Sequence, residues 1–234
     1  MKYTLSIFLL LLFLNILSGQ NLIKDPGFES VYLYKDGKRE HFGYKDWKFL
    51  SRIPMNTWAG APDFEVYNSR SLSDEKIKSY FTPFAGNSYL SSVYTIDKNL
   101  YQGQLVKPLI KGKKYKFSCQ YKFGGEIMSE SVIQNLLNYN MGVMFSNSDL
   151  SDTLSVKKIH DPKVELPIHI SFNNFKYKSD NSKWKYFETT FISDSDYNYI
   201  VIGSFQKLMD KSPFPPYIHY GISFRFDEVS LVEE

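Results

Sequence analysis

The sequence predicts an all-β protein, an antiparallel β-sandwich with at most one short helix. The 234 residues include 18 Tyr and 19 Phe, and aromatic side chains favour pleated, half-buried strands. Apolar and polar residues alternate over short segments, and turn-forming residues separate these segments. Only residues 129–137 have a helix-like pattern. One sandwich with long loops accounts for the length of the chain.

The first 20 residues predict a secretory signal peptide. Lys2 precedes an apolar run at residues 7–14, and Ile16, Leu17 and the small residues Ser18 and Gly19 follow it. The run is shorter than the roughly 20 apolar residues that a spanning helix needs, and no cysteine follows it as a lipid-anchor site. We expect cleavage between Ser18 and Asn21, no membrane span, and a single mature domain at residues 21–234. This domain would be secreted or displayed at the cell surface, or held in the periplasm.

Seven strands are expected in the body of the domain. They lie at residues 88–95, 101–109, 115–123, 140–146, 184–192, 197–206 and 221–232. Alternation on the third of these puts Phe117, Cys119 and Tyr121 on the core face and Gln120 on the other face. Cys119 is the one cysteine of the chain, so no intrachain disulfide forms, and we expect it to be a packed, unreactive thiol.

The two ends of the mature chain carry matching patterns. Residues 21–29 read NLIKDPGFE and residues 226–231 read FDEVSL, and each is a short apolar segment with a carboxylate at its border. If these end segments pair, Glu29 and Asp227 come together. Carboxylate oxygens suit a hard cation such as calcium. The alternative is that both carboxylates are ordinary solvated groups at strand ends.

This frame resembles that of galactose-binding-like jelly rolls, which include many carbohydrate-binding modules. Such modules often open with NL…NxxFE and close with an apolar residue followed by DxVxL. The resemblance implies a jelly-roll topology, a structural calcium ion at Glu29 and Asp227, and a glycan or cell-envelope component as the ligand.

Internal segments resemble a surface module of Bacteroidetes that is often fused to OmpA-like domains. The matching segments are residues 83–90 (PFAGNSYL), 101–115 (YQGQLVKPLIKGKKY), 140–146 (NMGVMFS) and 199–205 (YIVIGSF). Their order and spacing carry the resemblance, which extends over the whole mature chain. It implies a role at the cell surface.

No catalytic constellation is recognisable, and we do not expect an enzyme. The four histidines, His41, His160, His169 and His219, lack metal-ligand spacing, and the chain has no G-x-S-x-G nucleophile motif. A glycosidase or lyase with an unrecognised pair of carboxylates is the remaining enzymatic alternative. The net charge of +3 is too small to favour nucleic acid.

Amide side chains on the polar strand faces are the expected ligand contacts, because they both donate and accept hydrogen bonds as sugar hydroxyls require. These residues are Gln102, Gln104, Gln120 and Asn140. The alternative is that such residues only keep the sheet soluble.

One tryptophan is the expected stacking platform. Trp58 lies in a turn-rich segment, NTWAG, and aromatic faces stack on sugar rings. Trp47 and Trp184 are interpreted as core residues. Together these observations predict a secreted, non-catalytic carbohydrate- or cell-envelope-binding module. The alternative is a protein-binding adhesion or structural surface protein, whose partner would be an outer-membrane protein.

Overall fold

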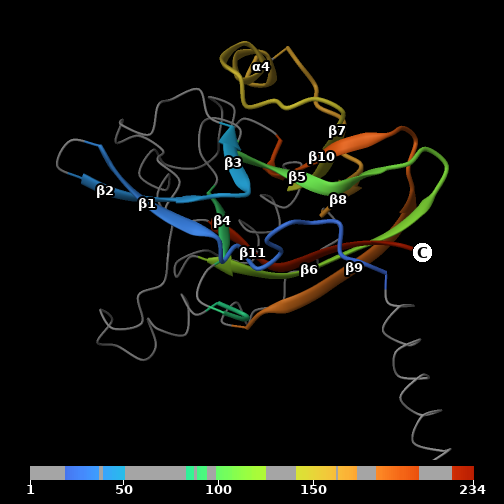
Figure 1. The fold of residues 1–234 in the computed structure, drawn as a ribbon, viewed down its shortest axis with the longest axis horizontal. Helices are drawn as coiled ribbons and strands as arrows, with labels where there is room; N and C mark the ends of the chain where they lie inside the picture. The colour runs from blue at the N-terminus through green and yellow to red at the C-terminus, as the bar shows by residue number, and fades with distance from the viewer. Residues whose placement is uncertain are drawn as a thin grey trace, which may run out of the picture.

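Two antiparallel sheets pack face to face in the computed structural model (Figure 1). The structure describes residues 19–36, 39–50, 83–86, 89–93, 99–124, 141–161, 163–172, 183–205 and 223–234. The five-stranded sheet has the order β3 (Trp47–Leu50), β5 (Asn99–Leu109), β10 (Tyr197–Ser204), β7 (Met141–Ser146) and β8 (Ile170–Ser171). The four-stranded sheet has the order β4 (Leu90–Val93), β11 (Ser223–Glu233), β6 (Lys114–Gly124) and β9 (Lys185–Ile192). The predicted all-β sandwich and its seven strands are confirmed.

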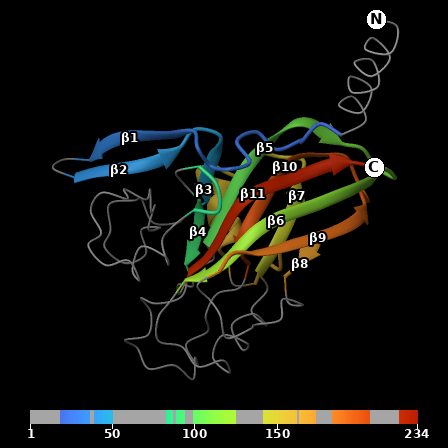
Figure 2. The same ribbon diagram turned by 90° about the horizontal axis from the view of Figure 1, so that it is seen from below.

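A separate hairpin was not expected from the sequence. Strands β1 (Val31–Asp36) and β2 (Arg39–Tyr44) pair only with each other among the described strands. They extend away from the edge of the sandwich (Figure 2).

The main core lies between the two sheets. On β6, Phe117, Cys119 and Tyr121 are buried as the alternation predicted. The rings of Phe172 and Phe187 contact Phe117, and the ring of Phe224 on β11 stacks on Tyr121. Burial raises the pKa of the Cys119 thiol, so the thiolate form is disfavoured and the expectation of a packed thiol is confirmed.

Trp47 is a core residue, as expected, and its position depends on a glycine across the sheet. Trp47 pairs with Gly103 on β5, and a Cβ at Gly103 would lie 3.1 Å from the indole ring. The indole Nε1–H donates to the carbonyl of Asp25 at 3.1 Å. The absence of a side chain at Gly103 therefore lets the indole lie flat over the strand.

A second layer covers the outer face of the five-stranded sheet. Helix α4 (Thr153–Ile159) and its flanking segments lie over β7 and β10 (Figure 1). They enclose a second apolar cluster, made of Leu50, Leu100, Met144, Ile159, Val201 and Phe205. The sequence did not predict this helix, and the expected helix at residues 129–137 lies outside the described residues. No helix in the described part of the chain is long and apolar enough to cross a membrane.

Local chemistry explains where α4 begins. Asp152 accepts hydrogen bonds from the backbone N–H groups of Leu154 and Ser155, at 2.9 and 3.0 Å. This is the N-cap arrangement that satisfies the first free donors of a helix. Lys157 and Lys158 lie in the last turn, where cations are favoured by the helix dipole.

The two ends of the domain lie side by side, which confirms one sequence prediction. Leu22 N donates to Leu231 O at 2.7 Å, and the Asn21 side chain bonds both Val229 O and Leu231 N. Residues 21–29 nevertheless form one isolated bridge, from Ile23 to Leu105, rather than a strand. Positive φ angles at Asp25 and Phe28 turn the chain away from the extended form.

Candidate functional site

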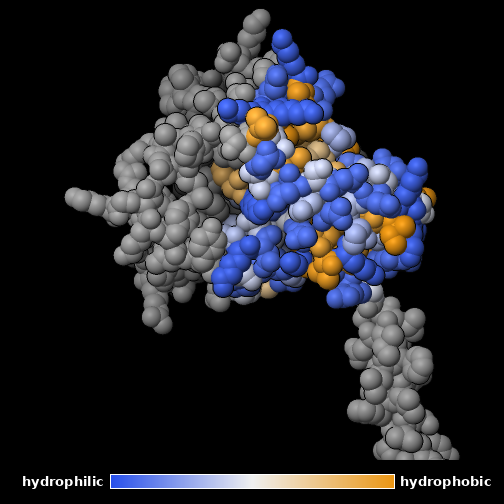
Figure 3. All heavy atoms as spheres, turned by 45° about the horizontal axis from the view of Figure 1, so that its top comes forward, coloured by the Kyte–Doolittle hydropathy of each residue, from blue (hydrophilic) through white to orange (hydrophobic). Residues whose placement is uncertain are grey.

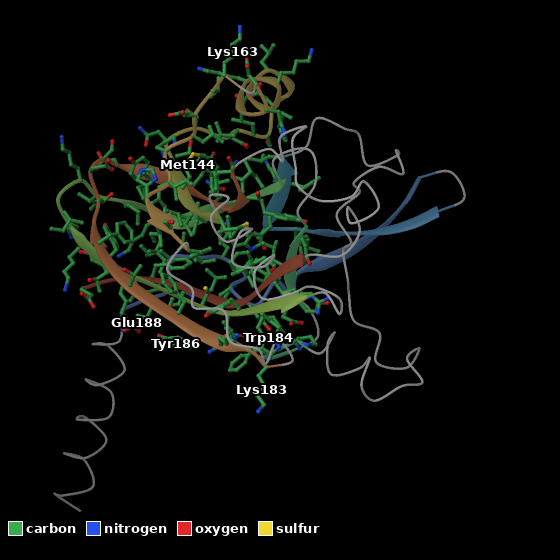
Figure 4. The ribbon with its side chains drawn as sticks, turned by 180° about the vertical axis from the view of Figure 1, so that it is seen from behind. Met144, Lys163, Lys183, Trp184, Tyr186 and Glu188 are labelled. Carbon is green, nitrogen blue, oxygen red and sulfur yellow. The ribbon has the colours of Figure 1, made fainter. Side chains whose placement is uncertain are left out.

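The outer face of the four-stranded sheet carries the exposed polar and aromatic side chains. Because Phe117 and Phe187 point into the core, the alternate positions on β6 and β9 point outward. The register then places three cross-strand pairs on the outward side, namely Gln120 with Tyr186, Ser118 with Glu188 and Lys116 with Thr190. Figure 4 shows Tyr186 and Glu188 along the outside of β9.

Tyr186 is the most exposed of the described aromatic side chains on this face, at 58 %. Its hydroxyl donates to Glu188 Oε2 at 2.6 Å and also contacts the Ser118 hydroxyl. Glu188 and Ser118 form the cross-strand pair next to that of Tyr186. The Tyr186 ring therefore extends along the sheet surface toward them and leaves one side open to solvent. Hydrogen bonding to Glu188 raises the pKa of the Tyr186 phenol. Lys116 Nζ lies 3.7 Å from the same carboxylate oxygen.

Trp184 precedes Tyr186 by two residues and lies on the same face. It is partly exposed rather than a core residue, which corrects the interpretation of the sequence. Its ring meets Phe84 and Tyr89 edge-on, with centroids 6.4 and 6.0 Å apart. Lys122 Nζ lies 5.9 Å from the indole centroid, within cation–π distance. Although Lys122 is on the outward side of β6, it is buried.

Phe84 reaches this face because Asp227 fixes the turn that carries it. Asp227 Oδ2 accepts from Phe84 N at 2.8 Å and from Ala85 N at 3.1 Å, and its Oδ1 accepts from Glu228 N. Burial raises the pKa of Asp227 to about 6. Gly86 continues the turn with φ of 62°, which favours glycine. Phe84 remains 50 % exposed.

Phe84, Trp184 and Tyr186 together form what we call the aromatic strip. The amide of Gln120 and the carboxylate of Glu188 lie beside it. This combination offers stacking surfaces and hydrogen-bonding groups on one open face, which suits a ligand with both apolar and hydroxylated sides.

The predicted metal ligands lie near the same turn. A Cβ at Gly86 would lie 2.2 Å from Glu29 Oε1, and one at Gly27 would lie 3.8 Å from Asp227 Oδ1. Backbone N–H groups already occupy both lone pairs of Asp227 Oδ2. The described residues contain no group of three or more His, Cys, Asp or Glu side chains placed to hold a metal ion. A calcium ion would therefore depend on Glu29, Asp227 Oδ1 and backbone carbonyls, and it remains a prediction.

The predicted ligand-binding residues do not share one surface. Gln120 lies beside the aromatic strip, whereas Gln104 is exposed on the outer side of the five-stranded sheet. Gln102 is 2 % exposed, and its amide bonds Asp149 Oδ1 at 2.7 Å and Leu150 N at 2.9 Å. Trp58 and Asn140 lie outside the described residues.

Sequence reasoning missed the aromatic strip, although a signal for it was present. Strand β9 and the residue before it carry aromatic residues on both faces, with Phe187 and Phe191 inward and Trp184 and Tyr186 outward. The outward set is followed in the alternation by Glu188. Trp184, Tyr186 and Glu188 are spaced two residues apart and therefore share one face. Because a glutamate is rarely buried, its presence indicates that this face is the solvent side.

No protein-family model and no curated protein matches this sequence. Among solved structures, the chain is similar to the carbohydrate-binding module TmCBM61, which was solved in complex with β-1,4-galactotriose. The identity is 12 %, the TM-score is 0.29, and the match covers 92 % of this chain and 99 % of the other. The β-sandwich assignment depends on the two sheets described above.

Proposed function

We propose that this protein is a non-catalytic carbohydrate-binding module that holds a glycan against the aromatic strip. The observation that carries the proposal is the juxtaposition of Phe84, Trp184 and Tyr186 with the polar groups of Gln120 and Glu188 on one open sheet face. Export through the N-terminal signal peptide, and a glycan or cell-envelope component as partner, are parts of the same proposal.

The chemistry of sugars accounts for this combination. A pyranose ring has an apolar C–H face that stacks on aromatic rings, and its hydroxyls need donors and acceptors at the edge of the contact. Residues two apart on a strand are separated by roughly 7 Å. Trp184 and Tyr186 can therefore contact neighbouring sugar units of one chain, with Gln120 positioned to bond their hydroxyls.

A glycan array followed by calorimetry tests this proposal. The array should include β-1,4-galactan, other neutral glycans and acidic glycans. For a glycan that binds, Trp184→Ala and Tyr186→Ala should each weaken binding about tenfold, as truncation of a central interface aromatic does. Tyr186→Phe should weaken it less, because the ring remains and only the hydroxyl contacts with Glu188 and Ser118 are lost.

Two further variants make the test specific. Ile192→Ala is the matched control, since Ile192 lies on the same face of β9 and is also exposed, but far from the strip. Trp58→Ala tests the platform expected from the sequence. If Trp58→Ala abolishes binding while Trp184→Ala and Tyr186→Ala leave it unchanged, the ligand does not bind at the aromatic strip.

The rival function is that of a protein-binding adhesion or structural surface protein. The observation that favours it is the projecting β1–β2 hairpin, which pairs with no other described strand (Figure 2). Capture of an outer-membrane protein that is insensitive to added glycan, and is lost when the hairpin is replaced by a short turn, would favour this rival.

N-terminal sequencing of exported protein tests the expected cleavage between Ser18 and Asn21.

A further inference from the structure

A pocket of about 500 Å³ lies on the opposite side of the molecule from the aromatic strip. It forms where the segment around α4 lies over the ends of β7 and β10 without closing completely on them. Figure 4 shows Met144, one of its residues, on the α4 side of the molecule, with Trp184 and Tyr186 far from it. With this side turned forward, the described surface is mainly hydrophilic with small apolar patches (Figure 3). The volume is in the range typical of small-molecule sites.

The pocket has an apolar part and a polar part. Apolar side chains come from the sheet and from the segment after α4, and they are Met144, Phe145, Leu150, Ile159, Val164, Leu166 and Pro167. The polar side chains are Ser146, Asn147, Ser148, Ser155, Lys158, His169 and Tyr197. None of these lining residues is an aspartate or a glutamate. Among the described residues, the lining is therefore amphipathic and carries no negative charge.

Lys158 supplies the positive charge of this lining. Ser155, Lys158 and Ile159 are spaced three and four residues apart on α4, so one helix face meets the pocket. Lys158 is exposed and forms no ion pair with any described carboxylate. Its ammonium group can therefore interact with a ligand without first breaking a salt bridge.

A fixed hydrogen-bond chain forms one wall of the pocket and leaves its histidine neutral. His169 Nδ1 accepts from Phe145 N at 3.1 Å, so the ring proton is on Nε2, which lies 2.9 Å from the Tyr197 hydroxyl. That hydroxyl donates to Asp194 Oδ1 at 2.7 Å. Burial lowers the pKa of His169. The charge offered to a ligand is therefore that of Lys158.

We propose that this pocket binds a small carboxylate with a short apolar tail. The tail would pack against Met144, Ile159 and Leu166, and the carboxylate would face Lys158 and the serine hydroxyls. This site is independent of the proposed glycan contact. Met144 and Ile159 belong to the apolar cluster of the five-stranded sheet and Leu166 packs against it, whereas the aromatic strip lies on the four-stranded sheet.

Titration of the full mature chain with hexanoate, followed by NMR or calorimetry, tests the proposal. Hexanoate should bind with a dissociation constant in the millimolar range, and hexanamide should bind more weakly. Lys158→Met should weaken hexanoate binding by about two- to fivefold, as expected for an exposed charge pair. Lys157→Met is the matched control, since Lys157 is the preceding residue of the same helix turn but does not line the pocket.

A second pair of variants separates this site from the glycan site. Val164→Phe should fill part of the pocket and reduce hexanoate binding, whereas Tyr186→Ala should leave it unchanged. Absence of hexanoate binding to the folded wild-type protein would overturn the proposal. Equal affinity for hexanoate and hexanamide would also overturn it, as would equal effects of Lys158→Met and Lys157→Met.

Discussion

In both sheets, successive side chains alternate between the core face and the outer face, but the outer face is covered in one sheet and exposed in the other. On the five-stranded sheet, α4 and its flanking segments cover the outward side chains, so that Leu100, Met144 and Val201 form a second apolar cluster. On the four-stranded sheet, the outward positions of β9 include exposed Tyr186 and Glu188. A covered face gains stability from burial, whereas an open face with aromatic and polar groups is available to a ligand.

The two glutamines at outward positions show what this difference means for single residues. Gln102 and Gln120 both point away from the main core. Gln102 is buried beneath the α4 segment and bonds Asp149 and Leu150, while Gln120 is partly exposed opposite Tyr186. A polar residue on an outward position is thus a structural group where a second layer covers it, and a candidate ligand contact where none does.

The largest effect should come from the side of β6 that faces the main core. Phe117→Ala should lower the free energy of unfolding by ~3–5 kcal/mol, because it leaves a cavity among packed rings. Gln120→Ala, three residues away on the outward side, should change it by less than about 0.5 kcal/mol. Chemical denaturation of both variants measures the difference. Equal destabilisation would mean that the two faces of β6 are assigned incorrectly.

A second test concerns the turn that carries Phe84 onto the open face. If calcium binds at Glu29 and Asp227, it should raise the melting temperature and EDTA should lower it. A ligand specific to the native state contributes ~2.7 kcal/mol at a hundredfold excess over its dissociation constant. Thermal unfolding with and without calcium measures this.

Variants of both carboxylates are needed for this test. Asp227→Ala should abolish the calcium-dependent shift, but it also removes three backbone hydrogen bonds and so lowers the baseline stability. Glu29→Gln is the milder variant, since Glu29 is exposed. Identical melting of the wild-type protein in calcium and in EDTA would leave both residues as ordinary carboxylates.

The third test compares two glutamines on one strand. Gln102→Ala should cost ~1–3 kcal/mol, because the part-buried N–H of Leu150 and the Asp149 carboxylate each lose a partner. Gln104→Ala, two residues on and exposed, should stay within about 0.5 kcal/mol. Denaturant melts of the two variants measure this contrast. A similar small cost for both would show that the hydrogen bonds of Gln102 to Asp149 and Leu150 contribute little to stability.

The sequence predicted the features that depend on local patterns. Alternation in residues 115–123 gave β6 with Phe117 and Cys119 inward, and the end motifs gave the contact between Leu22 and Leu231. These signals are strong because a one-residue shift in the register of a half-buried strand would move all of its apolar side chains to the solvent face.

The sequence did not predict which outward faces are covered, and this decides the candidate site. The α4 segment has a short helix started by Asp152, and helices of this length carry little periodic signal. At β9, the rings of Phe187 and of Trp184, which directly precedes the strand, would both suit a core, so aromatic content alone does not identify the inner face. The covered outer face and the open one can be told apart only from where the fold places helix α4 with its flanking segments and the turn that carries Phe84.

The smallest expected effect tests the covered face through His169. Its pKa is lowered by burial, below the ~6.5 of an unfolded histidine, so the native state resists protonation. This contribution to stability is present above about pH 6.5 and declines as the pH falls, because the unfolded chain takes up a proton there first. Protonation of Nδ1 would also displace the hydrogen bond from Phe145 N. Denaturation at pH 7.5 and at successively lower pH should therefore show a steeper loss for the wild-type protein than for His169→Gln, which cannot titrate. Parallel pH profiles for the two proteins would mean that His169 is equally protonated in both states.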